Sequence, residues 1–416
     1  MPPLIALLTD FGLTDPYVAQ IKAVLAGAAP GVPVVDVSHG VSPFNLVQAG
    51  FFLAASAPHF PAGTVFVAVV DPGVGTERRI VLLESGGHRF LAPDNGLLGL
   101  VMDRGGLLRA YDLDAGDVIH VDTGVYSLAT NIVLEAGDSG VSIEGAKMAG
   151  HVTTLNRGNT ASGRVAFEFQ GADDVSLDHL AITGGQYGIY AGSVDSDRVS
   201  VSNADIYGNT QDGISFDGGN DGLHVWGSRV HGNSQRGLDL TGAGALIENN
   251  EVFGNGNYGI YVSYIGSLAN RVVLRDNVVH DNASHGIYGN NTVWIVGNDV
   301  YGQSNSNVYG VVVGGADGVA ENNDIHGNYH GVSVSGGALV TGNEIYGNSQ
   351  YGAHVSSSSS GDIIGNRIYG NSQGIVDSGY GHIQNNVLYT NTNVGISLGW
   401  RHNSDDMVSN NTIYQP

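Results

Sequence analysis

The sequence predicts a mixed two-module chain. Residues 1–113 are expected to form a truncated α/β domain with a parallel sheet, and residues 116–416 an all-β right-handed parallel β-helix, a solenoid. Three observations predict this. A coil-sized pattern recurs almost to the end of the second module, whereas the first alternates strand-like and helix-like segments without a repeat. Glycine, at 64 of 416 residues, is about twice as frequent as average, which suits many tight turns.

The first module begins with strand-like and helix-like segments in turn. The expected strands are 4–8, 34–37, 65–70 and 80–84, and the expected helices lie near 17–28 and 46–55. This order predicts a parallel sheet with helical crossovers. Turns rich in acidic residues and glycine follow three strands, and open parallel sheets bind ligands at the carboxyl ends of strands. A carboxylate after the first strand commonly holds ribose hydroxyls, so the pattern is compatible with a nucleoside ligand.

Five stretches of this module carry a specific set of motifs. They are LTDFGLTD at 8–15, VSHGVSP at 37–43, FPAGT at 60–64, VVDPGVGTERR at 69–79 and APDNGLL at 92–98. Together they closely resemble the N-terminal domain of the S-adenosylmethionine hydrolase (adenosine-forming) family, which also contains the fluorinases and chlorinases.

The resemblance implies a role for the matching residues. The residues implied to bind the nucleoside are Asp10, on the ribose hydroxyls, with Phe11, Asp15, Phe44 and Asn95. Asp71 and Arg78 match two members of the family's Asp-Arg-His set that activates water, and their spacing resembles the hydrolases rather than the halogenases. The implied reaction is displacement at C5′ of the sulfonium by an oriented water or hydroxide.

The match stops near residue 113. In the family, the next segment leads to a Thr-Phe-His-Gly-Arg-Asp motif that supplies the catalytic histidine, and then to a β-barrel domain that completes the adenine site across a trimer interface. Neither is present in this sequence. His120 is the nearest downstream histidine, but it lies in a predicted β-helix strand and is not assigned the role. Three interpretations stay open: a relic with little activity, a working hydrolase, or a domain that retains nucleoside binding or serves as a scaffold.

The second module repeats one six-residue pattern: Asn, a charged residue, an aliphatic residue, a ring, Gly and Asn. It is clearest at 250–255, 323–328, 343–348 and 366–371. From Ile206 to Ile413 the pattern recurs in nine steps with a mean of 23 residues, the length of one coil with three short strands. A second strand of each coil follows a glycine, and a third precedes the asparagine. Less regular coils are expected between 117 and 205.

Eight coils place an asparagine two residues before the central aliphatic residue. They are Asn250, Asn277, Asn298, Asn323, Asn343, Asn366, Asn386 and Asn411. Stacked coils would bring these amides about 4.8 Å apart, so that each can donate to the next. The pattern therefore predicts a structural ladder and not a ligand set.

The residue after each central aliphatic residue should point outward. This predicts a stripe along one face, which comprises Tyr207, His231, Phe253, His280, Tyr301, His326, Tyr346, Tyr369, Tyr389 and Tyr414. Charged residues on the other side of the aliphatic residue share that face, from Asp205 to Arg367. Two interpretations stay open: a platform for an extended sugar chain, or rings that stack between coils. Because the rings point outward, their removal is expected to have little effect on the melting temperature.

The repeat resembles carbohydrate-active β-helix proteins, including alginate C5-epimerases and polysaccharide lyases. Such enzymes need a base and a way to neutralise the uronate. The richest cluster of suitable side chains is His231, Arg236, Asp239, Tyr258, Tyr261, Asp276, His280, Asp281, His285 and Tyr288, of which His231, Arg236, His280 and His285 are the candidate catalytic group. The Asp-Pro-His motif of the epimerases is not present, which argues against that activity.

Composition limits the classes of partner that the chain is expected to bind. A net charge of −23 argues against nucleic acid and anionic membranes, and no cysteine is available for thiolate chemistry. No cofactor and no metal site are expected, and Asp217–Gly222 is interpreted as a turn rather than a calcium loop. The N-terminus lacks the features of a signal peptide, so the cytoplasm is the default location; non-classical export or display at the cell surface is the alternative.

The sequence thus predicts a β-helix that binds or modifies a polysaccharide or oligosaccharide, joined to a partial, weak or inactive S-adenosylmethionine hydrolase-like domain. The alternative is an active hydrolase that releases adenosine and methionine, with the β-helix as its scaffold. S-Adenosylmethionine or adenosine is then the second expected partner. Whether the chain is an enzyme stays undecided, as does its oligomeric state.

Overall fold

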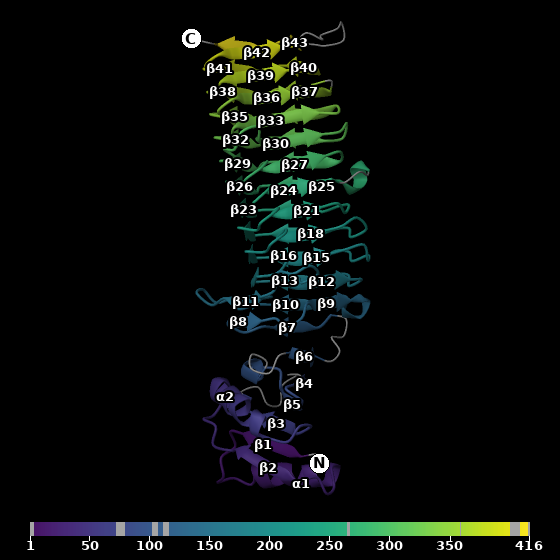
Figure 1. The fold of residues 1–416 in the computed structure, drawn as a ribbon, viewed down its shortest axis with the longest axis vertical. Helices are drawn as coiled ribbons and strands as arrows, with labels where there is room; N and C mark the ends of the chain where they lie inside the picture. Colours follow the sequence, from purple (N-terminus) through teal and green to yellow (C-terminus); the bar gives the residue numbers. More distant parts are fainter. Residues whose placement is uncertain are drawn as a thin grey trace.

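The computed structural model describes residues 4–71, 80–101, 107–110, 116–263, 267–357, 359–399 and 408–414. A small α/β domain lies at the N-terminal end of a long stack of β-coils, and the C-terminus lies at the far end of the stack (Figure 1). Within these ranges, no helix is both long and apolar enough to cross a membrane.

The N-terminal domain contains a six-stranded sheet in the order β2-β1-β3-β5-β4-β6. Its elements are β1 (Ile5–Thr9), α1 (Tyr17–Ala28), β2 (Val34–Ser38), α2 (Leu46–Ser56), η1 (Ala57–His59), β3 (Val65–Val69), β4 (Ile80–Ser85), β5 (His88–Pro93) and β6 (Leu107–Ala110). As predicted, β1 is parallel to β2 and β3, and β3 is parallel to β5. Leu53, Phe66 and Phe90 are buried in the core of this domain.

The far edge of this sheet differs from the predicted all-parallel arrangement. β4 is antiparallel to both β5 and β6. Only Gly86 and Gly87 separate β4 from β5, and their φ angles of 56° and 80° are those of a tight hairpin turn. A two-residue connection cannot make the crossover that parallel strands require, so the sheet is mixed.

The second module is a right-handed solenoid of three parallel sheets, as the sequence predicted. Sheet I has 13 described strands. They are β7 (Val118–His120), β10 (Ser142–Glu144), β13 (Ser176–Asp178), β16 (Ser200–Ser202), β19 (His224–Trp226), β22 (Leu246–Glu248), β25 (Val272–Arg275), β28 (Val293–Val296), β31 (Val319–Glu321), β34 (Ala338–Thr341), β37 (Ser360–Ile364), β40 (Tyr380–Gln384) and β43 (Val408–Ser409).

Sheet II contains the repeated six-residue pattern and also has 13 described strands. They are β8 (Gly124–Ser127), β11 (Thr153–Asn156), β14 (Leu180–Thr183), β17 (Asp205–Tyr207), β20 (Arg229–His231), β23 (Glu251–Phe253), β26 (Val278–His280), β29 (Asp299–Tyr301), β32 (Asp324–His326), β35 (Glu344–Tyr346), β38 (Arg367–Tyr369), β41 (Val387–Tyr389) and β44 (Thr412–Tyr414).

Sheet III contains the strands predicted from the repeated glycine and has 12 described strands. They are β9 (Ile132–Glu135), β12 (Phe167–Gln170), β15 (Ile189–Ala191), β18 (Ile214–Phe216), β21 (Leu238–Leu240), β24 (Ile260–Val262), β27 (Ile287–Asn290), β30 (Tyr309–Gly314), β33 (His330–Ser335), β36 (Tyr351–Val355), β39 (Gln373–Asp377) and β42 (Val394–Leu398). Two single-turn helices, η2 (Ala136–Asp138) and η3 (Leu268–Asn270), interrupt the turns.

The predicted boundary between the modules, between 113 and 116, falls largely on residues outside the described ranges. The last strand of the N-terminal sheet ends at Ala110, and the first strand of the solenoid begins at Val118. The boundary itself stays a prediction.

Most sheet III strands have a glycine directly before them or as their second residue, and close packing between coils requires it. A Cβ atom on Gly259 would lie 2.6 Å from the carbonyl oxygen of Gly286 and 2.8 Å from the side-chain nitrogen of Asn282. Side-chain atoms essentially never approach backbone that closely, so any other residue would push the coils apart. The repeated glycine in the sequence thus marks a tight corner.

The asparagines predicted to form a ladder do so. Each Nδ2 from Asn250 to Asn386 donates to the Oδ1 of the next rung, at 2.9–3.1 Å, along one line that ends at Asn411. A second ladder, which we did not predict, lies at the other end of the sheet II strands. It comprises Asn209, Asn233, Asn255, Asn282, Gln303, Asn328, Asn348, Asn371 and Asn391. The last Asn of the same six-residue pattern could have predicted this second ladder.

Candidate functional site

The nucleoside residues implied by the family resemblance lie at the carboxyl ends of the N-terminal strands. The Asp10 carboxylate follows β1 and accepts a hydrogen bond from the backbone N–H of Phe44, at 2.9 Å. Phe44 has a left-handed backbone (φ 62°) and an exposed ring. Phe11 lies beside the ring of Tyr17, and Asp15 is exposed. The structure therefore brings Asp10 and Phe44 into contact.

Asp71 and Asn95 form a second contact in this region. Asp71 directly follows Val70 at the end of β3 and is 6% exposed. The Asn95 side chain donates to the carbonyl oxygen of Val70 at 2.9 Å and approaches Asp71 Oδ1 at 3.4 Å. Arg78, the other implied catalytic residue, lies outside the described residues. The roles of Asp71 and Arg78 stay predictions.

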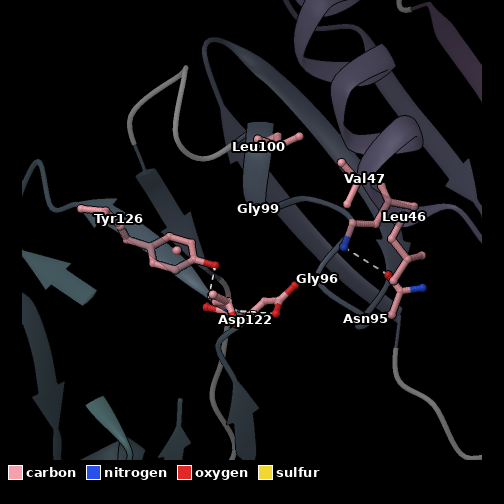
Figure 2. Close-up of a pocket in the computed structure, with 12 residues that line it drawn as sticks. Leu46, Val47, Asn95, Gly96, Gly99, Leu100, Asp122 and Tyr126 are labelled. Carbon is pink, nitrogen blue, oxygen red and sulfur yellow. Dashed lines mark hydrogen bonds between the residues drawn. The ribbon is translucent and has the colours of Figure 1, made fainter. Parts of the chain in front are cut away.

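A cavity of about 260 Å³ lies between Asn95 and the first coil of the solenoid (Figure 2). Its lining comprises Leu46, Val47, Asn95, Gly96, Leu97, Gly99, Leu100, Asp122, Thr123, Gly124, Val125 and Tyr126. The Tyr126 hydroxyl donates to the carbonyl oxygen of Asp122 at 3.1 Å, and Asn95 Oδ1 accepts from the backbone N–H of Leu97 at 3.2 Å. One nucleoside-site residue therefore borders a cavity whose other wall belongs to the solenoid.

The predicted stripe lies along sheet II, and its rings are stacked on one another. From Tyr207 to Tyr389, neighbouring ring centroids are 4.6–5.4 Å apart, with interplanar angles of 3–13°. Tyr414 continues the register beyond Tyr389 and is 66% exposed. Both faces of each inner ring are therefore covered by the rings of adjacent coils. A glycan on this stripe would meet ring edges and hydroxyl groups, not ring faces.

The predicted cluster of candidate bases is divided between two sheets. His231 and His280 belong to the stripe on sheet II, whereas Arg236 and His285 precede strands β21 and β27 of sheet III. The division has a simple cause: a coil turns between the two sheets, so residues close in sequence face different directions. The four residues of the candidate catalytic group therefore do not all lie on one sheet.

On sheet III, a column of polar side chains occupies the position directly before the repeated glycine. This pre-glycine column comprises Tyr187, Asp212, Arg236, Tyr258, His285, Tyr309, His330 and Tyr351. Several neighbours are in ring contact: Tyr309 stacks on His330 at 4.6 Å, and His330 stacks on Tyr351 at 4.4 Å. Sequence reasoning missed most of this column, although the residue before each repeated glycine is readable directly from the sequence.

A second column lies within the sheet III strands, beside the first. This strand column comprises Tyr190, Ser215, Asp239, Tyr261, Tyr288, Val312, Ser333 and His354, which are register partners in successive coils. Tyr261 and Tyr288 stack at 5.0 Å, and the Tyr309 hydroxyl lies 2.8 Å from His354 Nδ1. The two columns form one face rich in phenols, imidazoles and carboxyl groups.

One buried carboxyl group, one partly buried carboxyl group and an arginine lie near one end of this face. The Arg236 guanidinium forms an ion pair with Asp239 and lies 4.2 Å above the Tyr261 ring. Asp212 accepts a hydrogen bond from the backbone N–H of Arg236 at 2.7 Å. Burial raises the pKa of Asp212 to about 6, and the nearby Asp239 carboxylate adds to this. Burial also raises the pKa of Asp239, against the effect of Arg236.

The histidines of this face carry no charge at neutral pH. Burial lowers the pKa of His285 and His354, and burial together with these two neighbours lowers the pKa of His330 to about 4. His285 Nδ1 accepts from the backbone N–H of Tyr309 at 2.8 Å, which fixes its ring. Burial raises the pKa of Tyr309 to about 12, so its hydroxyl stays protonated. The face therefore offers neutral donors and acceptors.

Comparison with known proteins also finds two parts in the chain. Residues 5–126 match the SAM hydroxide adenosyltransferase N-terminal domain. Residues 133–300 and 289–416 match the right-handed β-helix region.

Curated relatives match the N-terminal domain, among them a hydrolase and a fluorinase. The (R)-S-adenosyl-L-methionine hydrolase of Thermus thermophilus is 53% identical over 93 residues, which are 22% of this chain and 36% of that protein. The fluorinase of an Actinoplanes species is 31% identical over 140 residues, covering 28% of this chain and 47% of that protein. The chain thus spans less than half the length of these relatives.

Among solved structures, the A-module of a mannuronan C-5 epimerase from Azotobacter vinelandii is similar, with a TM-score of 0.43 and 17% identity. The alignment covers 91% of this chain and 97% of that chain.

Proposed function

Because the chain belongs to the right-handed β-helix family over most of its length, we propose that its solenoid binds an extended, neutral oligosaccharide on sheet III. The observation that carries this proposal is the group formed by Asp212, Arg236, Asp239 and Tyr261 at one end of a face lined with phenols and neutral imidazoles. Sugar hydroxyls both donate and accept hydrogen bonds, and this face offers partners for both.

The charges of the face support a neutral glycan over a polyuronate. Arg236 is the one arginine or lysine in the two columns, and its guanidinium is already paired with Asp239. Asp212 and Asp217 lie nearby, and the Tyr190 hydroxyl donates to Asp217 at 3.3 Å. A uronate would bring further negative charge to a chain with a net charge of −23. Like charges repel at this range, so a neutral sugar chain is favoured.

The two carboxyl groups also suit hydrogen bonding to sugar hydroxyls. A carboxylate accepts hydrogen bonds from hydroxyl groups, and a protonated carboxyl group can also donate one. Asp239 has the more exposed carboxyl group of the two, with 19% of its side chain accessible, and Asp212 has the pKa of about 6. We assign Asp239 the place facing the ligand and Asp212 the place behind it, where it also fixes the backbone of Arg236.

Calorimetric titration with matched oligosaccharides tests the proposal. Neutral gluco-oligosaccharides should bind more tightly than oligouronates of equal length. Tyr261→Ala should weaken binding roughly tenfold, or about 1.4 kcal/mol, because it removes a hydroxyl that can bond to the sugar and the ring over which Arg236 lies. Asp239→Asn should also weaken binding, because it removes the charge of the carboxylate placed facing the ligand.

The stripe on sheet II supplies the matched control. Tyr346→Ala removes one tyrosine from a coil without touching sheet III, so glycan binding should be unchanged. If Tyr346→Ala loses binding while Tyr261→Ala keeps it, the glycan site lies on the stripe and the proposal for sheet III is wrong. Tighter binding of the oligouronates would overturn the choice of a neutral glycan.

A second candidate function is nucleoside binding by the N-terminal domain. Its support is the match over residues 5–126 together with the contact between Asp71 and Asn95. Asn95 lines the cavity between the N-terminal domain and the first coil. We propose that adenosine or S-adenosylmethionine binds there, with Asp10 on the ribose. Titration with adenosine, compared with Asp10→Ala and with Asp362→Ala in the solenoid, tests binding. Chromatographic detection of released adenosine tests hydrolysis separately, and no binding to the intact chain would end this second candidate.

A further inference from the structure

Three histidines of the stripe make the same diagonal contact with a carboxylate of the preceding coil. His231 Nε2 lies 2.9 Å from Asp205, His280 Nε2 lies 3.3 Å from Glu251, and His326 Nε2 lies 3.1 Å from Asp299. In each case a third residue lies on the strand of the histidine, directly opposite the carboxylate in the register. These third residues are Arg229, Val278 and Asp324. The same arrangement is thus present three times with one position changed.

The changed position decides the charge of each arrangement. Arg229 lies 3.8 Å from Asp205 and 2.8 Å from Glu251, so its charge is matched by carboxylates on both sides. Val278 adds no charge. Asp324 instead places a second carboxylate opposite Asp299, and like charges directly opposite on neighbouring strands are destabilising.

The next coil adds a third carboxylate to this line. Glu344 is the register partner of Asp324. It is already engaged, since Arg367 lies 3.3 Å from it and the Tyr369 hydroxyl donates to it at 2.7 Å. In the described part of the chain, no lysine or arginine lies within ion-pair distance of Asp299 or Asp324. Asp324 Oδ1 is shielded from water and has no hydrogen-bond partner.

The positions of the donor atoms fit a single small cation. One ligand atom each from Asp299, Asp324 and His326 lie within 4.8 Å of one another. Carboxylate oxygens and imidazole nitrogens bind such ions at about 2.0–2.2 Å, so two ligands on one ion are separated by about 3–4 Å. A small side-chain movement would close the site. All three residues are partly exposed, which leaves room for water to complete the coordination shell.

We propose that Asp299, Asp324 and His326 bind one divalent cation across strands β29 and β32. The mixture of two carboxylates and one imidazole favours Zn²⁺ or Mn²⁺ over Ca²⁺ and Mg²⁺, which prefer oxygen ligands throughout. The ion neutralises the two facing carboxylates and joins two coils. Sequence reasoning found no sign of this site, because its ligands come from two coils and because the same spacing occurs at two positions without the second aspartate.

The test compares the intact chain, stripped of metal, with Asp324→Val. This variant reproduces the natural arrangement at Val278 and should therefore be compatible with the coil. Titration with Zn²⁺ by calorimetry and with Mn²⁺ by electron paramagnetic resonance, both at physiological salt, should show one site in the natural chain. Asp324→Val should weaken that site by at least about tenfold, since even the loss of a residue that only supports a metal ligand has such effects.

A melting experiment provides a second measurement. Added metal should raise the melting temperature of the natural chain and leave that of Asp324→Val unchanged. Asp362→Val is the matched control: it removes one carboxylate that lies 2.9 Å from a histidine, His382, on sheet I. That variant should bind and respond to metal like the natural chain.

Equal metal affinity in the natural chain and Asp324→Val, or equal thermal shifts, would overturn the proposed metal site. The contact between His326 and Asp299 would then be structural only. His326→Gln serves if Asp324→Val fails to fold, because it keeps both carboxylates while removing the nitrogen ligand. Unchanged metal binding in His326→Gln would overturn the proposal in the same way.

Discussion

At the scale of single residues, Asp212 links protonation to folding. Its carboxyl group has a pKa of about 6 in the folded chain, against 3.8 for the free group. The folded state therefore holds this proton more tightly, and its stability falls as the pH rises from about 4 to about 6. Above pH 6 the charged carboxylate lowers the free energy of unfolding by the full amount, roughly 3 kcal/mol by linkage.

We expect Asp212→Asn to be more stable than the natural chain above pH 6, by up to roughly 3 kcal/mol, and to match it near pH 4. Asparagine keeps an oxygen that can accept the hydrogen bond from the backbone of Arg236. Denaturant unfolding at several pH values measures the difference. Asp15→Asn, an exposed position in the other module, is the control and should show no such trend. A constant difference across the pH range would contradict this assignment.

The asparagine ladder gives a second prediction at this scale. Asn298 is 1% exposed, donates to Asn323 and to the carbonyl oxygen of Leu274, and accepts from Asn277. Its replacement leaves several buried polar groups without partners, at about 1–3 kcal/mol for each group. We expect Asn298→Ala to lower the free energy of unfolding by more than about 3 kcal/mol.

The last rung of the same ladder is the natural control for this measurement. Asn411 lies near the C-terminal end of the solenoid, accepts from Asn386 and donates to Ile383, and is only partly buried. Water can replace the hydrogen bonds that Asn411 loses. Asn411→Ala should therefore lower the free energy of unfolding by clearly less than Asn298→Ala does. Similar losses for Asn298→Ala and Asn411→Ala would show that the ladder does not stabilise the chain through its buried hydrogen bonds.

At the scale of elements, the stripe on sheet II joins consecutive coils. Tyr346 stacks on His326 at 4.8 Å and on Tyr369 at 5.0 Å, and Tyr369 also stacks on Tyr389 at 4.7 Å. Outward direction alone suggested that these rings contribute little to stability. The stacked geometry leads to the opposite expectation, since each aromatic contact contributes about 0.5–1.5 kcal/mol.

We therefore expect the double change Tyr346→Ala and Tyr369→Ala, which removes three stacking contacts, to cost roughly 2–4 kcal/mol in equilibrium unfolding. Tyr207 lies at the end of the stack, with His231 as its one stacked neighbour in the stripe. Tyr207→Ala should therefore lower the free energy of unfolding by less than the double change does. Tyr346→Phe keeps the ring and should restore most of the loss. An unchanged melting temperature in the double variant would mean that stacking adds nothing beyond strand pairing.

At the scale of the whole molecule, the chain has two separate hydrophobic cores. One lies in the N-terminal domain and includes Phe66, and the other runs along the solenoid and includes Ile260. No described residue belongs to both. Separate cores predict two thermal transitions rather than one.

Calorimetry of two core variants tests this. Phe66→Ala and Ile260→Ala each open a cavity and should cost about 2–5 kcal/mol. The first should lower only the transition of the N-terminal domain, and the second only that of the solenoid. If either substitution shifts both transitions equally, the modules unfold as one cooperative unit.

The sequence alone predicted the solenoid, its coil length and the line of asparagines from Asn250 to Asn411. It also predicted the parallel strands β1 to β3 and their two helices. These features follow from patterns that repeat at a fixed spacing or alternate within one segment, so the information is local. The stripe from Tyr207 to Tyr389 was predictable for the same reason.

Tertiary structure alone decided which side chains share a face and which meet across coils. It separated His231 and His280 from Arg236 and His285, brought the Asp212 carboxylate to the backbone N–H of Arg236, and set Asp324 opposite Asp299. It also turned the edge of the N-terminal sheet antiparallel through Gly86 and Gly87. These outcomes depend on the direction of the chain at each corner and on coils that differ in length, so residues meet only after the coils are stacked.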